Sequence, residues 1–141
     1  MILLKKKNII LLLIIVSILA ITVTSLFYSF YKVDYVKEFN MSIIVGDHIG
    51  IDVSADELRF GMVPPGQGSA TRNINVHNSK NYPLKVNVHK YGEIKDWVSV
   101  SPQNFIIKEN EDKQVSFDAK PPSETEYGNY TGKIRFYFLK T

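Results

Sequence analysis

Few residues of this sequence have the types and spacing that metal binding requires. The candidates are three histidines and one loose acidic set: His48, His77 and His89, and Asp47, Asp52, Asp56 and Glu57. Zinc is commonly bound by imidazole and Ca²⁺ by carboxylates. On the simplest hairpin register, with His77 beside Lys85, His77 and His89 lie four residues apart along a sheet, too far to share a metal. The acidic spacing matches no EF-hand loop, so we interpret it as solvated loop charge and expect no metal site and no cofactor.

Motifs for nucleophilic catalysis and phosphate binding are also missing from the sequence. The serines and threonines form no Gly-x-Ser-x-Gly elbow and have no evident base beside them. Gly66-Gln67-Gly68 has neither a following helix nor a lysine at the P-loop position. The sequence has no cysteine, which excludes disulfides, thiol catalysis and thiolate metal ligands. We therefore predict that the chain has no enzymatic activity of its own.

An apolar amino-terminal segment positions everything that follows it. Residues 8–30 contain no charged side chain, and as a helix the run from Ile9 to Phe30 is roughly 33 Å long, enough to cross a hydrocarbon core of about 30 Å. Residues 1–7 carry three lysines and no acid, so the positive-inside rule predicts a cytoplasmic tail there and an extracytoplasmic remainder. The alternative is a signal peptide cleaved near Val23-Thr24-Ser25, whose apolar core is normally only about 7 to 15 residues. We favour an uncleaved, single-pass signal anchor in the cell membrane, with lipid as its partner.

The rest of the chain divides into a predicted stalk and one domain. Residues 31–44 have mixed charge and no strong periodicity, so we predict a juxtamembrane stalk there. Residues 45–141 carry twelve basic and twelve acidic side chains, and the net charge of +3 therefore comes from the anchor and its flanks. A neutral domain gives no support to a nucleic-acid partner.

The domain has the alternation that is typical of short strands. Apolar and polar residues alternate over 84–89 and again over about 130–139, and the residues predicted to point inward are Leu84, Val86, Val88, Ile134, Phe136 and Phe138. Proline and glycine turns, such as residues 64–68, separate the strands. Seven or eight strands and no helix after the anchor predict an all-β fold, an antiparallel immunoglobulin-like sandwich. Trp97 is the expected core anchor, as the largest side chain of the core.

Several motifs carry a resemblance to a known class of domain. They are Leu58-Arg-Phe-Gly61, Val63-Pro-Pro-Gly66, Asn78 with Pro83, Trp97-Val-Ser-Val-Ser-Pro102 and Gly128-Asn-Tyr-Thr-Gly-Lys-Ile134. In their order they resemble the immunoglobulin-like modules of archaeal and bacterial surface proteins, including the abnormal-spindle/hydin-like sandwiches, over about residues 58–138. The resemblance implies an adhesion, spacer or assembly domain and supplies no catalytic residue. This chain departs from the usual arrangement because it has a single copy tied directly to an anchor.

Two sequons offer candidate modification sites on the side predicted to face outside. They are Asn40-Met41-Ser42 and Asn129-Tyr130-Thr131, and we expect Asn40 and Asn129 to be glycosylated only if the host organism modifies such sites. Otherwise both asparagines are ordinary surface residues.

Aromatic residues supply the candidate contact surface for a protein partner. Tyr137 and Leu139, on an expected edge strand, together with Tyr127 and Tyr91, are predicted to dock a partner or to accept an added strand. The alternative is that they are scattered surface aromatics. We predict a membrane protein that displays a binding or assembly module. The alternatives are a structural subunit of a pilus-like or surface-layer assembly and an accessory subunit of a membrane enzyme complex.

Overall fold

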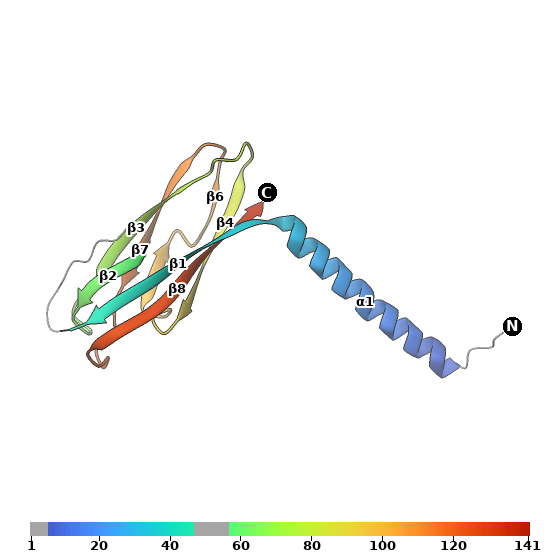
Figure 1. The fold of residues 1–141 in the computed structure, drawn as a ribbon, viewed down its shortest axis with the longest axis horizontal. Coiled ribbons are helices and arrows are strands. Elements are labelled where there is room, and N and C mark those ends of the chain that lie inside the picture. Colours follow the sequence, from blue (N-terminus) through green and yellow to red (C-terminus); the bar gives the residue numbers. More distant parts are fainter. Residues whose placement is uncertain (1–5, 47–56) are drawn as a thin grey trace. The chain divides into compact units, whose positions relative to one another are not determined.

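The computed structural model describes residues 6–46 and 57–141, which form one amino-terminal helix and eight strands in two sheets (Figure 1). The chain divides into two compact units, residues 1–34 and residues 35–141. His48 and the acidic residues Asp47, Asp52 and Asp56 lie outside the described residues.

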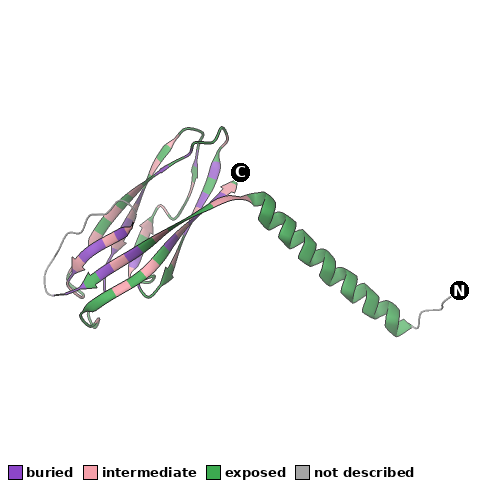
Figure 2. Cartoon of the chain, viewed as in Figure 1, coloured by how far each residue is buried: buried purple, intermediate pink, exposed green. Residues whose placement is uncertain are grey.

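The helix α1 (Lys6–Lys32) is apolar around its whole circumference. None of its 27 residues is buried in the structure, as the uniform colour in Figure 2 shows. The hydroxyls of Ser17, Thr22 and Thr24 each donate to the carbonyl oxygen four residues earlier, at 2.8 Å, so these polar groups are satisfied within the helix. The helix contains the predicted span and is long and apolar enough to cross a membrane, and a signal sequence has the same features.

The larger sheet has the strand order β2-β1-β8-β4-β6. Its strands are β1 (Val33–Val45), β2 (Leu58–Val63), β4 (Leu84–Gly92), β6 (Asn104–Ile107) and β8 (Gly128–Lys140). β4 pairs with β6 and with β8 in the antiparallel sense, and β8 runs beside β1 in the opposite direction (Figure 1). β1 and β2 are parallel, with a register shift between Ser42 and Ile44, so the prediction of a purely antiparallel fold is wrong for this pair.

The smaller sheet has the order β3-β7-β5, with β3 (Ala70–His77), β7 (Asp112–Ala119) and β5 (Val98–Ser101). β3 pairs with β7 along its whole length, from Ala70 opposite Ala119 to His77 opposite Asp112. β7 is therefore the central strand, and among the described strands β3 forms a backbone ladder with β7 alone.

The two sheets share one hydrophobic core. Phe117 of β7 meets Phe136 of β8 edge to face, with ring centroids 6.1 Å apart, and both rings are buried. The side chains predicted to point inward from the two alternating segments are buried: Leu84, Val86, Val88, Ile134, Phe136 and Phe138. Buried and exposed residues alternate along the strands in Figure 2, as the two-residue period of a strand requires.

Trp97 is not the central side chain of this core. The largest fully buried side chains are Phe60, Phe117 and Phe136, whereas Trp97 is half-buried and packs edge-on against Tyr130 at 4.8 Å. Trp97 ends the turn before β5, and Val98 takes the first inward position of that strand. Because successive side chains of a strand point to opposite faces, the residue before Val98 is directed to the rim.

The predicted stalk is also wrong, because residues 33–45 form β1. Met41 and Ile43 of this strand are almost fully buried, and Tyr35 and Phe39 pack against the core from the same face. Lys37 occupies the inward position between those two rings. Because a charged residue stands where an apolar one is expected, the sequence of β1 does not show the apolar alternation that predicts a strand.

A buried asparagine joins the end of β3 to the turn between β6 and β7. The Nδ2 atom of Asn78 donates to the carbonyl oxygens of Tyr82 and Lys108, each at 2.9 Å, and also reaches the carbonyl oxygen of Ile107 at 3.3 Å. Its Oδ1 atom accepts the backbone N–H of Lys80 at 3.0 Å. Asn78 is the buried polar side chain among the described residues, and the sequence pattern indicated only a turn there.

Candidate docking surfaces

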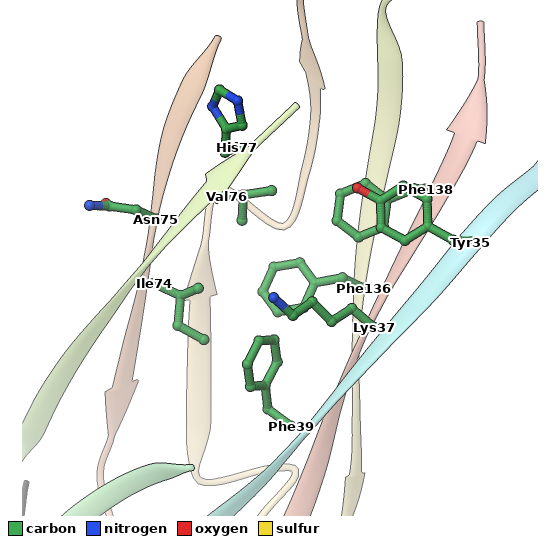
Figure 3. A pocket seen from close by; sticks show the side chains of 9 residues that line it. All are labelled: Tyr35, Lys37, Phe39, Ile74, Asn75, Val76, His77, Phe136 and Phe138. Atoms are coloured by element: carbon green, nitrogen blue, oxygen red, sulfur yellow. The ribbon is translucent and has the colours of Figure 1, made fainter. Parts of the chain in front are cut away.

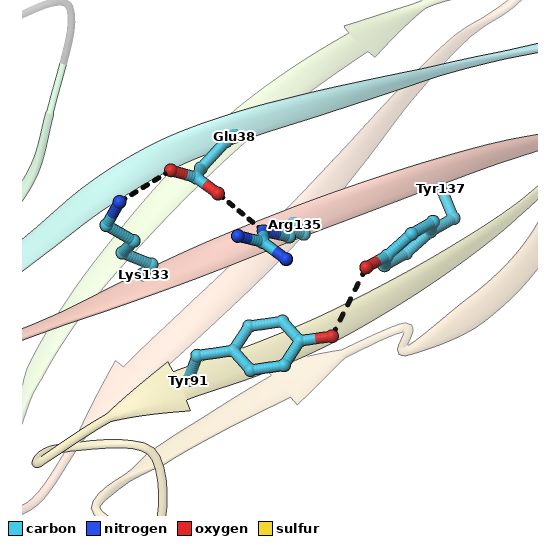
Figure 4. A network of polar contacts seen from close by, with 5 residues as sticks. All are labelled: Glu38, Tyr91, Lys133, Arg135 and Tyr137. Carbon is cyan, nitrogen blue, oxygen red and sulfur yellow. Dashed lines mark hydrogen bonds and ion pairs between the residues drawn. The ribbon is translucent and has the colours of Figure 1, made fainter.

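The outer face of the larger sheet brings together two of the four aromatic and aliphatic residues predicted to contact a partner. Arg135 of β8 lies opposite His89 of β4. Tyr91 follows His89 by two residues and Tyr137 follows Arg135 by two residues, so on these antiparallel strands the two tyrosines lie on either side of the pair. Their hydroxyl oxygens are 3.3 Å apart, and the Arg135 guanidinium lies 5.0 Å from the centre of the Tyr91 ring. We call Glu38, Tyr91, Lys133, Arg135 and Tyr137 the outer-face network (Figure 4).

Glu38 connects β1 to this network. One carboxylate oxygen accepts from Lys133 Nζ at 2.8 Å and the other accepts from Arg135 Nε. The hydrogen bond from Lys133, followed by that from Arg135, holds the pKa of Glu38 below its ordinary value, and the bond to Glu38 raises the pKa of Arg135. The side chains are exposed, so solvent screens these ion pairs and they contribute little to stability.

The two tyrosines differ in acidity because they interact through a shared hydrogen bond. The Tyr91 and Tyr137 hydroxyls share one hydrogen bond, in which either can be the donor, and this bond raises the pKa of Tyr91. The same hydrogen bond, together with the nearby Arg135, lowers the pKa of Tyr137. Each of the five side chains contacts another member of the outer-face network, so this face is a pre-organised amphipathic surface.

Leu139 and Tyr127 are not among the five residues of this network. Leu139 is half-buried on the same strand as Tyr137 and pairs with Lys85, whereas Tyr127 is 67% exposed in the turn before β8. The prediction that Tyr137 and Leu139 lie on an edge strand is wrong, because β8 is third of five strands, between β1 and β4. A strand with two neighbours has no free backbone edge, so this face can offer side chains to a partner but cannot accept a strand.

The predicted hairpin between the strands of His77 and His89 does not exist. His77 lies on β3 and His89 on β4, and these strands belong to different sheets. His77 Nδ1 lies 3.0 Å from Asp112 Oδ1, and the His89 ring packs edge-on against Tyr137. Within residues 6–46 and 57–141, no three histidine, aspartate or glutamate side chains lie close enough together to hold a metal ion.

Both predicted glycosylation sites lie on exposed strand positions. Asn40 is in β1 and Asn129 is in β8, and both side chains are exposed. Asn40 also lines an open hollow of about 440 Å³ beside Gly92 and Gly132. The amides are therefore accessible, and glycosylation itself stays a prediction.

A second surface, which the sequence did not predict, is a groove between β1, β3 and β8. It encloses about 210 Å³ and is drawn in Figure 3. The residues that line this β1–β3 groove are Tyr35, Lys37, Phe39, Ile74, Asn75, Val76, His77, Phe136 and Phe138. Tyr35 stacks on Phe138 at 4.0 Å, and Phe39 meets Phe136 edge to face at 5.8 Å. The signal that could have revealed it is the Tyr35-x-x-x-Phe39 spacing in the supposed stalk, since both rings lie on one face of a strand.

Comparison with known proteins finds no protein-family model, no curated protein and no solved structure that matches this chain. The resemblance of its motifs to immunoglobulin-like surface modules stays a prediction.

Proposed function

We propose that this chain is a single-pass membrane protein that displays an immunoglobulin-like β-sandwich outside the cytoplasm as a binding or assembly module, without catalysis of its own. The observation that carries the proposal is the pairing of a fully exposed apolar helix with a separate β unit that has its own core. An exposed helix of this length and composition is stable only in an apolar surrounding, which a bilayer supplies.

Charge supports the proposed orientation. Lys5, Lys6 and Lys7 precede the apolar run, whereas the segment just after it balances two lysines with Asp34 and Glu38. The positive-inside rule then keeps the amino terminus in the cytoplasm and exports the β unit.

The surfaces of the β unit support binding rather than chemistry. The outer-face network fixes two tyrosines and an arginine on one exposed face, and such residues are enriched in protein interfaces. The β1–β3 groove adds a hollow lined by aromatic and aliphatic side chains and by Lys37, Asn75 and His77. We infer that the partner is a protein.

Protease treatment of sealed cells tests the location. We expect added protease to remove the β unit from intact cells and leave a membrane-embedded amino-terminal fragment. A β unit that is digested only after the cells are lysed contradicts the proposed orientation. An intact mass that corresponds to a chain beginning near Ser25 contradicts the anchor and identifies a cleaved signal sequence.

Crosslinking in intact membranes, followed by identification of the attached proteins, tests the binding role. A distinct partner at fixed stoichiometry is the expected result. Self-crosslinked ladders with long polymers would instead support the pilus-like or surface-layer assembly, and a catalytic partner would support an accessory subunit. If the β unit is exposed on the cell but crosslinks to no protein, the proposed binding role is contradicted.

A further inference from the structure

The larger sheet extends beyond the smaller one, and this leaves part of its inner face uncovered. Five strands face three, and β3 is the edge of the smaller sheet on the side of β1. Tyr35 and Phe39 of β1 pack against the core but remain only half-buried. Figure 3 shows these rings on one side of the β1–β3 groove and Ile74 and Val76 of β3 on the other. A fourth strand beside β3 would cover them.

The edge of β3 is available along its second half. Near its start, β3 lies against β2, because Arg72 Nε donates to the carbonyl oxygen of Arg59 at 2.8 Å. From Ile74 to His77, no strand of the described part of the chain pairs with the outer edge of β3. An edge strand presents unpaired N–H and C=O groups, to which an extended segment can add by backbone hydrogen bonding.

The size and lining of the groove suit the side chains of such a segment. A volume of about 210 Å³ accommodates one or two large apolar side chains and is too small for a helix. The apolar part of the walls consists of rings from β1 and β8 and the aliphatic side chains of β3, and Lys37, Asn75 and His77 supply the polar part. Because alternate residues of a strand point to one face, an added segment needs apolar residues at every second position.

Lys37 defines the charge of the partner. Its ammonium group lies 5.0 Å from the centre of the Phe39 ring and has no carboxylate partner among the described residues. His77 lines the same groove, and its Nδ1 atom lies 3.0 Å from Asp112 Oδ1. An added strand would bury this inward-pointing lysine, and a purely apolar strand would leave it without a counter-ion. A strand that carries a carboxylate at this point removes the penalty.

We propose that the β1–β3 groove binds an extended segment of a partner protein, which adds as a strand to the free edge of β3, inserts alternate apolar side chains and places a carboxylate against Lys37. This inference rests on the proposed binding function and identifies the surface and the kind of partner. The segment extends the smaller sheet and buries Tyr35 and Phe39.

Peptide binding to the full-length protein in detergent micelles tests the proposal. The probes are peptides of about nine residues, enough to span the eight-residue β3, with threonine alternating with valine, leucine or phenylalanine and with one central aspartate. Matched peptides carry lysine instead of aspartate. We expect the aspartate peptides to bind about tenfold or more tightly than the lysine peptides, as for a close charge pair at an interface. We also expect hydrogen exchange to slow at the backbone amides of residues 74–77.

Charge reversal separates this site from non-specific binding. Lys37→Glu should reverse the preference to the lysine peptides, and Lys37→Gln should abolish it without reversal. Lys85→Glu, at an exposed position of the same sheet on β4, is the matched control and should leave the preference unchanged. An unchanged unfolding transition verifies that each variant is folded.

Four results would overturn the proposal. These are no binding by any peptide of the panel at millimolar concentration, a preference that survives Lys37→Glu, protection at β5 or β6 instead of β3, and a concentration-dependent dimer that protects β3 without peptide. The protease test is independent of all four. If the β unit is exposed on sealed cells but binds no peptide as an added strand, this inference is refuted and the proposed location is unaffected.

Discussion

Asn78 offers the sharpest test of how the two sheets are joined. It lies between β3 of the smaller sheet and β4 of the larger one, and it is completely buried. Its side chain bonds three carbonyl oxygens and one backbone N–H, from both the β3–β4 connection and the β6–β7 turn. Its backbone adds two more bonds to that turn, to Glu111 and from Asn110, which a substitution of the side chain would leave in place.

Replacing Asn78 with alanine should lower the free energy of unfolding by about 2–4 kcal/mol. Each lost hydrogen bond contributes about 1 kcal/mol net, and the carbonyl oxygens left buried without a donor add to the cost. Because the β unit has about a hundred residues, this corresponds to a fall in melting temperature of roughly 10–25 °C. The Asn78→Asp substitution should be at least as damaging near neutral pH, because the carboxylate cannot donate and faces three carbonyl oxygens.

The assay is urea unfolding of the full-length protein in detergent, followed by the fluorescence of Trp97, which is the one tryptophan of the chain. Asn81→Ala, at an exposed position of the same turn, is the matched control and should change stability by less than about 0.5 kcal/mol. The reasoning is refuted if Asn78→Ala is as mild as Asn81→Ala.

Three further substitutions test the core, the strand packing and the outer-face network. Phe117→Ala, at a fully buried position, should cost about 3–5 kcal/mol of unfolding free energy in the same urea assay, and a loss below 1 kcal/mol would contradict the shared core. Gly132→Ala should cost about 1–3 kcal/mol, because its new Cβ would lie 2.6 Å from the carbonyl oxygen of Tyr91, whereas Gly128→Ala meets only ordinary contacts and should be near neutral. Glu38 has a lowered pKa, so its stabilising effect is present above the ordinary carboxyl pKa and is lost as pH falls through the folded value. The stability difference between wild type and Glu38→Gln should therefore shrink on acidification, and a difference that grows toward acid would contradict the assigned ion pairs.

Local sequence patterns predicted the elements that depend on local physics. The uninterrupted apolar run determines α1, since no tertiary contact is needed to recognise a helix that is apolar all round. The strict alternation over residues 84–89 and 130–139 determined which side chains of β4 and β8 face the core. Two of the predicted contact residues, Tyr91 and Tyr137, do lie together on one outer face.

Strand pairing was beyond the reach of the sequence because it joins residues that are far apart in the chain. Glu38 of β1 contacts Arg135 of β8, which lies 97 positions later in the chain. Because β1 is a neighbour of β8 in the sheet, β8 is a central strand and not an edge strand. Lys37 concealed the inward face of β1, although that face lines the groove. Trp97 has the size of a core residue, but its place at the end of a turn directs it to the rim.

The sequence by itself determined an apolar helix, a neutral β domain and the two faces of its most regular strands. The tertiary structure decided the neighbours of each strand, and with them the outer-face network, the free edge of β3 and the burial of Asn78. The physical reason is that hydrophobic periodicity is a property of successive residues, whereas an edge, a groove or a buried hydrogen-bond network exists only where distant segments meet.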